Sequence, residues 1–354
     1  MRVLSLVGAR PQFIKEAVVQ EELQKAGIQE ILVHSGQHYD YNMSDVFFEV
    51  LRMKEPDYNL NVGSGLHGEV TGKIMIEFEK VVLKEKPDVI LVYGDTNTTL
   101  AGALVGAKLK IPVAHVEAGI RQKPKDMPEE INRVVTDHVS KLLFCPSQLA
   151  VKNLEKEGIT EGVYFVGDVM YDLFLKMKPF FDYSVLGEYG LKENEYIVCT
   201  IHRDFNTDNR ENLEAIVENL NKISKQMQIV FPVHPRTKKM LEKFGLMGRI
   251  EKGVLLLEPL DYLKMMGLVE KSSLVITDSG GLQKEAYFCG KRAIVVMPDT
   301  GWRELVEIGW NRLSSCGDIY KVFLSILTKK IEHFSDVYGN GESAKRIVEI
   351  LLKM

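Results

Sequence analysis

Short apolar runs alternate with segments of helical period along the whole chain. Runs such as "VLSLV" (3–7), "VILVY" (89–93) and "PVAHV" (112–116) are almost continuously hydrophobic and rich in branched side chains. The segments between them, of which "PQFIKEAVVQEELQKAG" (11–27) is the first, place apolar residues every three or four positions. Continuous apolar strands separated by helices are typical of a parallel sheet that helices cover on both faces, so the pattern predicts an α/β fold.

The alternation lapses once and then starts again, which predicts two domains. An aromatic and charged passage fills residues 167–195, after which "YIVCTI" (196–201) resumes the pattern. A length of 354 residues also exceeds the roughly 250–300 residues at which one hydrophobic core usually stops growing. We therefore expect two Rossmann-like domains, residues 1–167 and 168–340, whose strand ends face a central cleft. The amphipathic helix expected at 341–354 would pack back onto the first domain.

Composition narrows the class of protein. Apolar residues make up 45% of the chain and charged residues 27%, values that are ordinary for a soluble globular protein. A net charge of −4 gives no general basic field for nucleic acid or an anionic membrane, and no apolar run approaches the roughly 18 residues of a membrane span. The four cysteines lie far apart, without C-x-x-C spacing, which favours a reduced, cytoplasmic protein without a metal site. Any anion site must therefore be local.

Basic residues follow the first predicted strand, at the edge where parallel α/β sheets bind ligands. In "GARPQFIK" (8–15), Pro11 stands near a predicted helix start, Arg10 offers a planar fork to a phosphate, and Lys15 follows about one turn later. Two interpretations stay open: the two cations form an anion site, or they only solvate the helix end. The motif is neither G-x-G-x-x-G nor a P-loop, so it predicts neither dinucleotide nor NTPase binding.

Three acidic positions follow other predicted strands of the first domain. Asp95 comes after "VILVY", Glu117 comes after "PVAHV", and Glu129 opens the helical stretch "MPEEINR". Ordinary alternative roles stay open, since Asp95, Thr96 or Asn97 could cap the helix that follows and Glu129 could compensate a helix dipole. Carboxylates crowded at strand ends have separated pKa values, which allows one site to hold a general acid and a general base. The first domain is therefore expected to carry the chemistry.

The second predicted domain also has polar residues after its strands. His202 and Arg203 follow the first of these strands in "TIHRDF", and His234 follows the second in "FPVHPRT". The histidines are ambiguous, because a lone histidine near a strand end often only satisfies a backbone group. No histidine pair has metal-ligand spacing and G-x-S-x-G is absent, which argues against metallohydrolase and serine hydrolase chemistry.

The turn "TDSGGLQKEA" (277–286) carries an anion-binding pattern. Its adjacent glycines, Gly280 and Gly281, allow the backbone to approach a phosphate, and Ser279 adds a hydroxyl donor at the start of a predicted helix. Glu285, one turn later, could accept hydrogen bonds from a ribose diol. A tight turn without a ligand is the alternative.

Together these motifs resemble the non-hydrolysing UDP-N-acetylglucosamine 2-epimerases. The match runs from end to end and includes, in the family's order and spacing, "GARPQFIK", "YGDTNTTLAGALV", "HVEAGIR", "MPEEINR", "PVHPRT" and "TDSGGLQKEA". The resemblance implies glycosyltransferase-B architecture, a homodimer, and epimerisation at C2 of a UDP-linked 2-acetamido sugar. It also implies elimination of UDP to a 2-acetamidoglucal followed by re-addition, a route that needs no NAD or metal.

The resemblance assigns roles to individual residues. The catalytic group it implies is Lys15, Asp95, Glu117, Glu129 and His202. The substrate-binding group it implies is Arg10, Arg133, Arg203, His234, Ser279, Gly280, Gly281 and Glu285. Within this scheme Arg133 supports Glu129 or the diphosphate. Which carboxylate removes the proton and which returns it stays open.

Departures from the family pattern bear on regulation and substrate. Members regulated at a second site carry a glutamine-containing stretch where this chain reads "GQHYDYNMSDVF" (36–47), and Lys73 stands where they tend to have arginine, which argues against allosteric activation. "IHRDFNTDN" and "GWRELVEIGWNRL" are closer to the branch that acts on UDP-2,3-diacetamido-2,3-dideoxy-glucuronic acid, whose carboxylate could pair with Arg203 or Arg236. UDP-N-acetylglucosamine is the first expectation and the diacetamido sugar is the alternative. A glycosyltransferase and a hydrolysing relative are more distant alternatives.

Overall fold

The computed structural model describes residues 1–36, 54–328 and 336–354, with every side chain in these ranges except that of Arg10. Most of the stretch "GQHYDYNMSDVF", on which the expectation about allosteric activation depends, lies outside the described residues. That expectation therefore stays a prediction.

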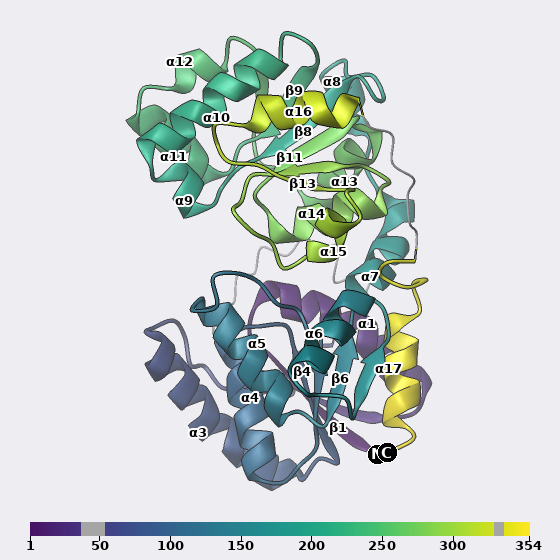
Figure 1. The fold of residues 1–354 in the computed structure, drawn as a ribbon. Helices are drawn as coiled ribbons and strands as arrows, with labels where there is room; N and C mark the ends of the chain where they lie inside the picture. The colour runs from purple at the N-terminus through teal and green to yellow at the C-terminus, as the bar shows by residue number, and fades with distance from the viewer. Residues whose placement is uncertain (37–53, 329–335) are drawn as a thin grey trace. The chain divides into compact units, whose positions relative to one another are not determined.

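The chain forms two compact units (Figure 1). The first consists of Met1–Lys176 together with Ser335–Met354, and the second consists of Met177–Phe334. The domain ranges expected from the sequence, 1–167 and 168–340, stay a prediction. Among the described residues, no helix combines the length and the hydropathy needed to cross a membrane.

The first unit is built on a parallel sheet with strand order β3-β2-β1-β4-β5-β6-β7. Its strands are β1 (Arg2–Val7), β2 (Gln29–His34), β3 (Tyr58–Asn59), β4 (Val89–Tyr93), β5 (Val113–Val116), β6 (Leu142–Cys145) and β7 (Val163–Phe165). The helices that accompany it are α1 (Arg10–Lys25), α3 (His67–Glu85), α4 (Asn97–Lys108), α5 (Pro128–Val139), α6 (Gln148–Lys156), α7 (Val169–Met177) and α17 (Ser343–Leu351). Helix α17 packs against α1, and the backbone N–H of Ala344 donates to Asp172 at 2.8 Å.

The second unit repeats the design with strand order β10-β9-β8-β11-β12-β13, again all parallel. Its strands are β8 (Tyr196–Thr200), β9 (Gln228–Pro232), β10 (Val254–Leu257), β11 (Leu274–Thr277), β12 (Ala293–Val295) and β13 (Arg312–Leu313). Its α-helices are α8 (Ser184–Glu188), α9 (Asp204–Thr207), α10 (Arg210–Ile223), α11 (Pro235–Lys243), α12 (Met247–Ile250), α13 (Tyr262–Lys271), α14 (Gly280–Phe288), α15 (Arg303–Glu307) and α16 (Ile319–Leu327).

Both sheets have the buried central strands that the apolar runs predict. All residues of β4 are buried, and helix α3 packs the apolar side chains of Ile74 and Phe78 onto the sheet. In the second unit, α10 and α16 pack together and bury Leu220 and Phe323 in its core. The predicted α/β class with two Rossmann-like parallel sheets is therefore confirmed.

Each sheet has one point where the strand order reverses direction. It lies between β1 and β4 in the first unit and between β8 and β11 in the second. Loops that leave neighbouring strands in opposite directions open a crevice at such a point, beyond the carboxyl ends of the strands. The loops after these four strands are therefore where a ligand site is expected.

Candidate active site

The turn between β1 and α1 is locked to the end of β4 by Gln12. The Gln12 side-chain oxygen accepts from the backbone N–H of Gly8 at 2.8 Å, and its amide nitrogen donates to the carbonyl of Tyr93 at 2.6 Å. A Cβ atom at Gly8 would overlap the hydroxyl oxygens of Thr98 and Ser35, so this turn accepts only glycine without rearrangement. The sequence interpretation missed Gln12, although it stands inside the "GARPQ" motif.

Helix α1 begins at Arg10, one residue before the predicted start at Pro11, and Lys15 lies in its second turn. The Lys15 ammonium forms an ion pair with the carboxylate of Glu117, and both side chains are nearly buried. Glu117 follows β5 directly and has a positive φ of 79°, a conformation that is uncommon for residues other than glycine. Such strain is typically held in place where a side chain has to point in a particular direction. The structure thus brings together two of the predicted catalytic residues.

Asp95 follows β4 and is held by Arg133 from helix α5. The Arg133 guanidinium forms an ion pair with Asp95, and its other terminal nitrogen donates to Glu130 at 3.1 Å. Burial opposes the charge on Arg133, but the two carboxylates raise its pKa above the ordinary value. Helix α4 is capped by Thr96, whose hydroxyl accepts from the N–H of Thr99 at 3.3 Å. Of the three caps considered, Asp95, Thr96 and Asn97, Thr96 is therefore confirmed as the cap.

The two glutamates at the start of α5 have different environments. Glu129 is exposed, whereas Glu130 is buried and accepts from the backbone N–H of Gln122 at 3.0 Å. Arg133 contacts Glu130 and Asp95, so the structure gives it other partners than the Glu129 that the sequence interpretation considered. The contact between Glu130 and Arg133 could have been expected from the sequence, because residues three positions apart lie on one face of a helix.

In the second unit, Asp278 at the end of β11 organises the loop after β8. Its carboxylate accepts from the backbone N–H of His202 at 3.0 Å, from that of Arg203 at 2.9 Å, and from the Asn206 amide at 2.9 Å. The His202 ring nitrogen Nδ1 lies 3.1 Å from the same carboxylate. Burial alone would raise the pKa of Asp278, but these donors together lower it. Asp278 is therefore ionised and holds the loop after β8 through these hydrogen bonds.

Four of the predicted residues line one pocket of about 240 Å³ in the second unit: His202, His234, Ser279 and Glu285. The rest of its lining is mainly apolar and consists of Thr200, Ile201, Pro232, Pro259, Leu260, Met265 and Leu282. The residues after β10 were missed, because "LEPL" contains no group that a sequence pattern would connect with a nucleotide. A mostly apolar pocket with a few convergent polar groups is the usual form of a small-molecule site.

Two polar groups of this pocket, Glu285 and His234, have pKa values shifted from their ordinary values. Burial raises the pKa of Glu285 to about 7, against a smaller opposing effect of the Lys284 charge. Burial, followed by the nearby His202 and Arg236, lowers the pKa of His234. The ring of His234 accepts from the backbone N–H of Arg236 at 3.2 Å and lies 5.6 Å from the ring of His202, centre to centre. His234 therefore caps α11 as a neutral ring.

Ser279 is the N-cap of α14, and the two predicted glycines form the first turn of this helix. A Cβ atom at Gly280 would come no closer than 3.9 Å to Trp302, and one at Gly281 no closer than 3.9 Å to Glu285. Neither glycine has a left-handed backbone, so neither is required by the fold of the second unit. Trp302 donates its indole N–H to the Gly280 carbonyl at 2.8 Å and steadies this turn.

Comparison with known proteins agrees with this architecture. Two all-parallel Rossmann-like sheets with polar clusters at their reversal points define the class of α/β enzymes that bind nucleotides at strand ends. The model of the UDP-N-acetylglucosamine 2-epimerase family matches residues 21–352. The chain belongs to this family of isomerases, which act at C2 of UDP-sugars, and the resemblance seen in its motifs is confirmed.

Individual relatives cover the whole chain. A UDP-N-acetylglucosamine 2-epimerase homolog of Methanococcus maripaludis is 45% identical over 99% of both chains. The UDP-2,3-diacetamido-2,3-dideoxy-D-glucuronate 2-epimerase of Pseudomonas aeruginosa is 44% identical over 100% of both. The crystal structure of the Methanocaldococcus jannaschii UDP-GlcNAc 2-epimerase in complex with UDP-GlcNAc and UDP matches with a TM-score of 0.87, 43% identity and full coverage of both chains.

Proposed function

We propose that this protein interconverts UDP-N-acetylglucosamine and UDP-N-acetylmannosamine. One observation carries the proposal: two carboxylates with separate cationic partners follow the neighbouring strands β4 and β5. Asp95 is bound to Arg133, Glu117 is bound to Lys15, and a Cβ on the intervening Gly94 would lie 3.4 Å from the Glu117 carboxylate. Epimerisation needs one group to remove the C2 proton and one to return it on the other face, and such a pair meets that need.

The nucleotide would occupy the pocket of the second unit. Ser279, Gly280 and Gly281 form a helix N-terminus whose backbone the diphosphate can approach closely, because glycine carries no side chain. Glu285 would accept hydrogen bonds from the ribose hydroxyls, and His202 would lie toward the leaving diphosphate. His234 would complete the wall of the same pocket.

The reaction is an elimination followed by an addition. A carboxylate of the Asp95, Glu117 and Glu129 set takes the C2 proton, the C2–H electrons form the C1=C2 bond, and the C1–O bond breaks so that UDP leaves with its electron pair. Lys15 and Arg10 stabilise the charge that develops on the departing diphosphate. UDP then adds back to C1 while a proton is delivered to the opposite face of C2. Arg133 orients the Asp95 carboxylate through their ion pair.

A deuterium experiment tests this function. Protein incubated with UDP-N-acetylglucosamine in heavy water, without added NAD or metal, should form the manno epimer and incorporate deuterium at C2. Mass spectrometry and proton NMR would follow both products. Unchanged substrate would refute the proposed activity, and full retention of the original C2 hydrogen would refute the elimination route.

UDP-2,3-diacetamido-2,3-dideoxy-glucuronic acid is the second candidate substrate. Arg236 is tied to Asp208 by an ion pair, whereas Arg203 is exposed and uses only its Nε atom, at 3.4 Å from the Asp278 carbonyl. Arg203 is therefore the better candidate to meet a C6 carboxylate. A parallel assay of the two nucleotide sugars, with Arg203→Ala alongside, separates the candidates. Selective loss of the uronic acid reaction in the variant would favour the second substrate.

We further propose that the protein works in the cytoplasm as a homodimer. The thiols of Cys145, Cys199, Cys289 and Cys316 are all unpaired, which supports a reducing compartment. The dimer is supported by the family resemblance. Light scattering coupled to gel filtration would measure the mass directly, and a mass near the 40.1 kDa of one chain would contradict the dimer.

A further inference from the structure

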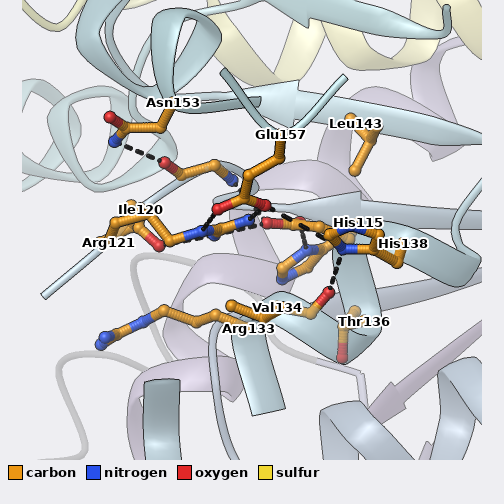
Figure 2. Close-up of polar contacts among 12 residues, drawn as sticks. His115, Ile120, Arg121, Arg133, Val134, Thr136, His138, Leu143, Asn153 and Glu157 are labelled. Carbon is orange, nitrogen blue, oxygen red and sulfur yellow. Dashed lines mark hydrogen bonds and ion pairs between the residues drawn. The ribbon is translucent and has the colours of Figure 1, made fainter. Parts of the chain in front are cut away.

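His115 is fully buried on β5, behind the candidate catalytic turn, and both of its ring nitrogens have partners. Nδ1 lies 2.7 Å from a carboxylate oxygen of Asp137, and Nε2 lies 2.7 Å from the carbonyl oxygen of Gly94. Figure 2 shows the ring near Arg121 and Glu157; Arg121 forms ion pairs with both Asp137 and Glu157. No step of the proposed reaction uses this histidine.

Both partners of the ring accept hydrogen bonds and donate none. A carbonyl such as that of Gly94 has no proton to give, so Nε2 must carry one. The second carboxylate oxygen of Asp137 accepts from the backbone N–H of Gly119 at 3.1 Å and from Arg121 at 2.7 Å. Burial raises the pKa of Asp137, but His115 and Arg121 together lower it below the ordinary value. Asp137 is therefore ionised, Nδ1 also carries a proton, and the ring is an imidazolium.

The surrounding charges balance this buried cation. Arg121 forms two hydrogen bonds of 2.7 Å with Glu157, so the cluster contains two cations, His115 and Arg121, and two carboxylates, Asp137 and Glu157. On the neighbouring strand β6, burial and the Asp137 charge raise the pKa of the Cys145 thiol, which therefore stays neutral. A buried charge persists when it is paired and hydrogen-bonded on all sides, as it is in this cluster.

Gly94 lies between this cluster and the candidate catalytic groups. Its N–H donates to the carbonyl of Val116 at 3.0 Å, and its positive φ of 65° turns the chain directly after β4. A Cβ at this position would lie 3.4 Å from the Glu117 carboxylate and 3.7 Å from the Lys15 ammonium. Any rotation of the Gly94 peptide would therefore alter the space around that ion pair.

We propose that His115 is a positioning residue that donates from both ring nitrogens, from Nδ1 to Asp137 and from Nε2 to the Gly94 carbonyl. Its Nε2–H group donates to the Gly94 carbonyl and so fixes the orientation of the Gly94–Asp95 peptide. This orientation positions Asp95 near Glu117. This inference depends on the proposed function, because it assumes that Asp95 and Glu117 carry out the proton transfers. The protonation of the ring is a separate claim that does not depend on activity.

Two amide substitutions separate the two hydrogen bonds of the ring. In His115→Gln the amide nitrogen can occupy the place of Nε2 and still donate to Gly94, whereas in His115→Asn it can occupy only the place of Nδ1. We expect kcat of the Asn variant to fall at least tenfold, with KM changed less than threefold, and the Gln variant to recover most of the activity. Equal kcat values in the two variants would overturn the positioning role, while absent turnover in the unmodified protein would overturn only the proposed function.

Nitrogen-15 NMR of the imidazole rings tests the protonation directly in the unmodified protein. We expect one ring with both nitrogens protonated, and this signal should disappear in His115→Asn. His138 provides the control, since its side chain is exposed and its Nδ1 contacts the Val134 carbonyl at 2.9 Å (Figure 2). His138→Asn should leave both the signal and kcat unchanged. If the ring signal lost in His115→Asn has a proton on only one nitrogen, the proposal is wrong.

Discussion

Lys15 and Glu117 meet as an ion pair across 102 positions of sequence. Lys15 comes from the second turn of α1, the helix after β1, and Glu117 is the residue after β5, so the pair connects segments that follow strands on opposite sides of β4. Only 11% of the Lys15 side chain and 7% of the Glu117 side chain are exposed. A pair so shielded from water affects both folding and the charge presented to a ligand.

Lys15→Met should destabilise the first unit by about 3 kcal/mol, because the buried Glu117 carboxylate loses the charge of its ammonium partner. Adding Glu117→Gln should restore part of this loss, since neither charge then remains. Urea unfolding followed by circular dichroism would measure the effect. Lys25→Met is the matched control on the same helix, because Lys25 pairs with Glu21 and Glu22 at the surface, and it should change stability by less than about 1 kcal/mol. Equal losses in the two methionine variants would contradict the expectation.

Asp95→Asn and Glu117→Gln should each lower kcat at least about 100-fold, the usual effect of removing a general acid or base. The dissociation constant for UDP should change less than threefold, because the candidate nucleotide pocket is lined by the second unit. Calorimetric titration with UDP and the deuterium assay would separate the two quantities. Asp88→Asn is a suitable control, since Asp88 is exposed before the start of β4 and only accepts from the Arg2 N–H. Retained turnover in both catalytic variants would refute their proposed roles.

Gly8→Ala should destabilise the protein by about 1–3 kcal/mol, a usual range for overpacking. The new methyl group would overlap the hydroxyls of Thr98 and Ser35, which hydrogen-bond to each other at 2.9 Å beneath the turn. Gly68→Ala in α3 is the control, because nothing lies within 4 Å of its Cβ position. Thermal unfolding should show a lower midpoint for the first variant and little change for the second. A neutral Gly8→Ala would mean that the turn rearranges readily.

The fold, and those residues of the candidate site that lie near strand ends, can be predicted from the sequence. Continuous apolar strands predict parallel sheets, and polar residues at or within about one helical turn of the strand ends are expected at the ligand-binding edge. This pattern predicts a site that contains Lys15, Asp95, Glu117 and Glu285. The ion pair between Lys15 and Glu117 could not be predicted, since it depends on the left-handed backbone of Glu117 and on which strands are neighbours. Neither the backbone conformation of Glu117 nor the order of strands in the sheet can be read from the sequence.

The residues that hold the site in place were missed for a common reason. Gln12, Glu130 and His115 act on backbone groups or on other side chains, and their types are ordinary for a helix or a strand. His115 stands inside the motif "HVEAGIR", but it lies within the strand, whereas the motif's expected site residue, Glu117, follows the strand. Such supporting roles follow only from three-dimensional contacts, because hydrogen-bond partners far apart in the chain leave no periodic signal.

Glu285 should make stability depend on pH below neutrality. Burial raises its pKa in the folded protein to about 7 from an ordinary value of 4.5, so the folded state retains a proton that the unfolded state releases. The free energy of unfolding should therefore fall as pH rises from about 4.5 to 7, by at most about 3 kcal/mol, and the partial exposure of Glu285 to the pocket reduces this amount. Glu285→Gln should remove that part of the slope in urea titrations at several pH values. An unchanged slope in the variant would assign the dependence to other groups.

The same carboxylate should make UDP binding tighter at higher pH. The ribose hydroxyls donate, so an ionised Glu285 accepts from them better than a protonated one, and affinity should rise several-fold between pH 6 and 8. The diphosphate of UDP contributes its own change, since a terminal phosphate loses its second proton near pH 6. Glu285→Gln retains only this phosphate contribution and is therefore the control in calorimetric titrations at both pH values. If the two proteins show the same pH dependence of the UDP dissociation constant, Glu285 does not bind the ribose, and the orientation proposed for the nucleotide in this pocket is wrong.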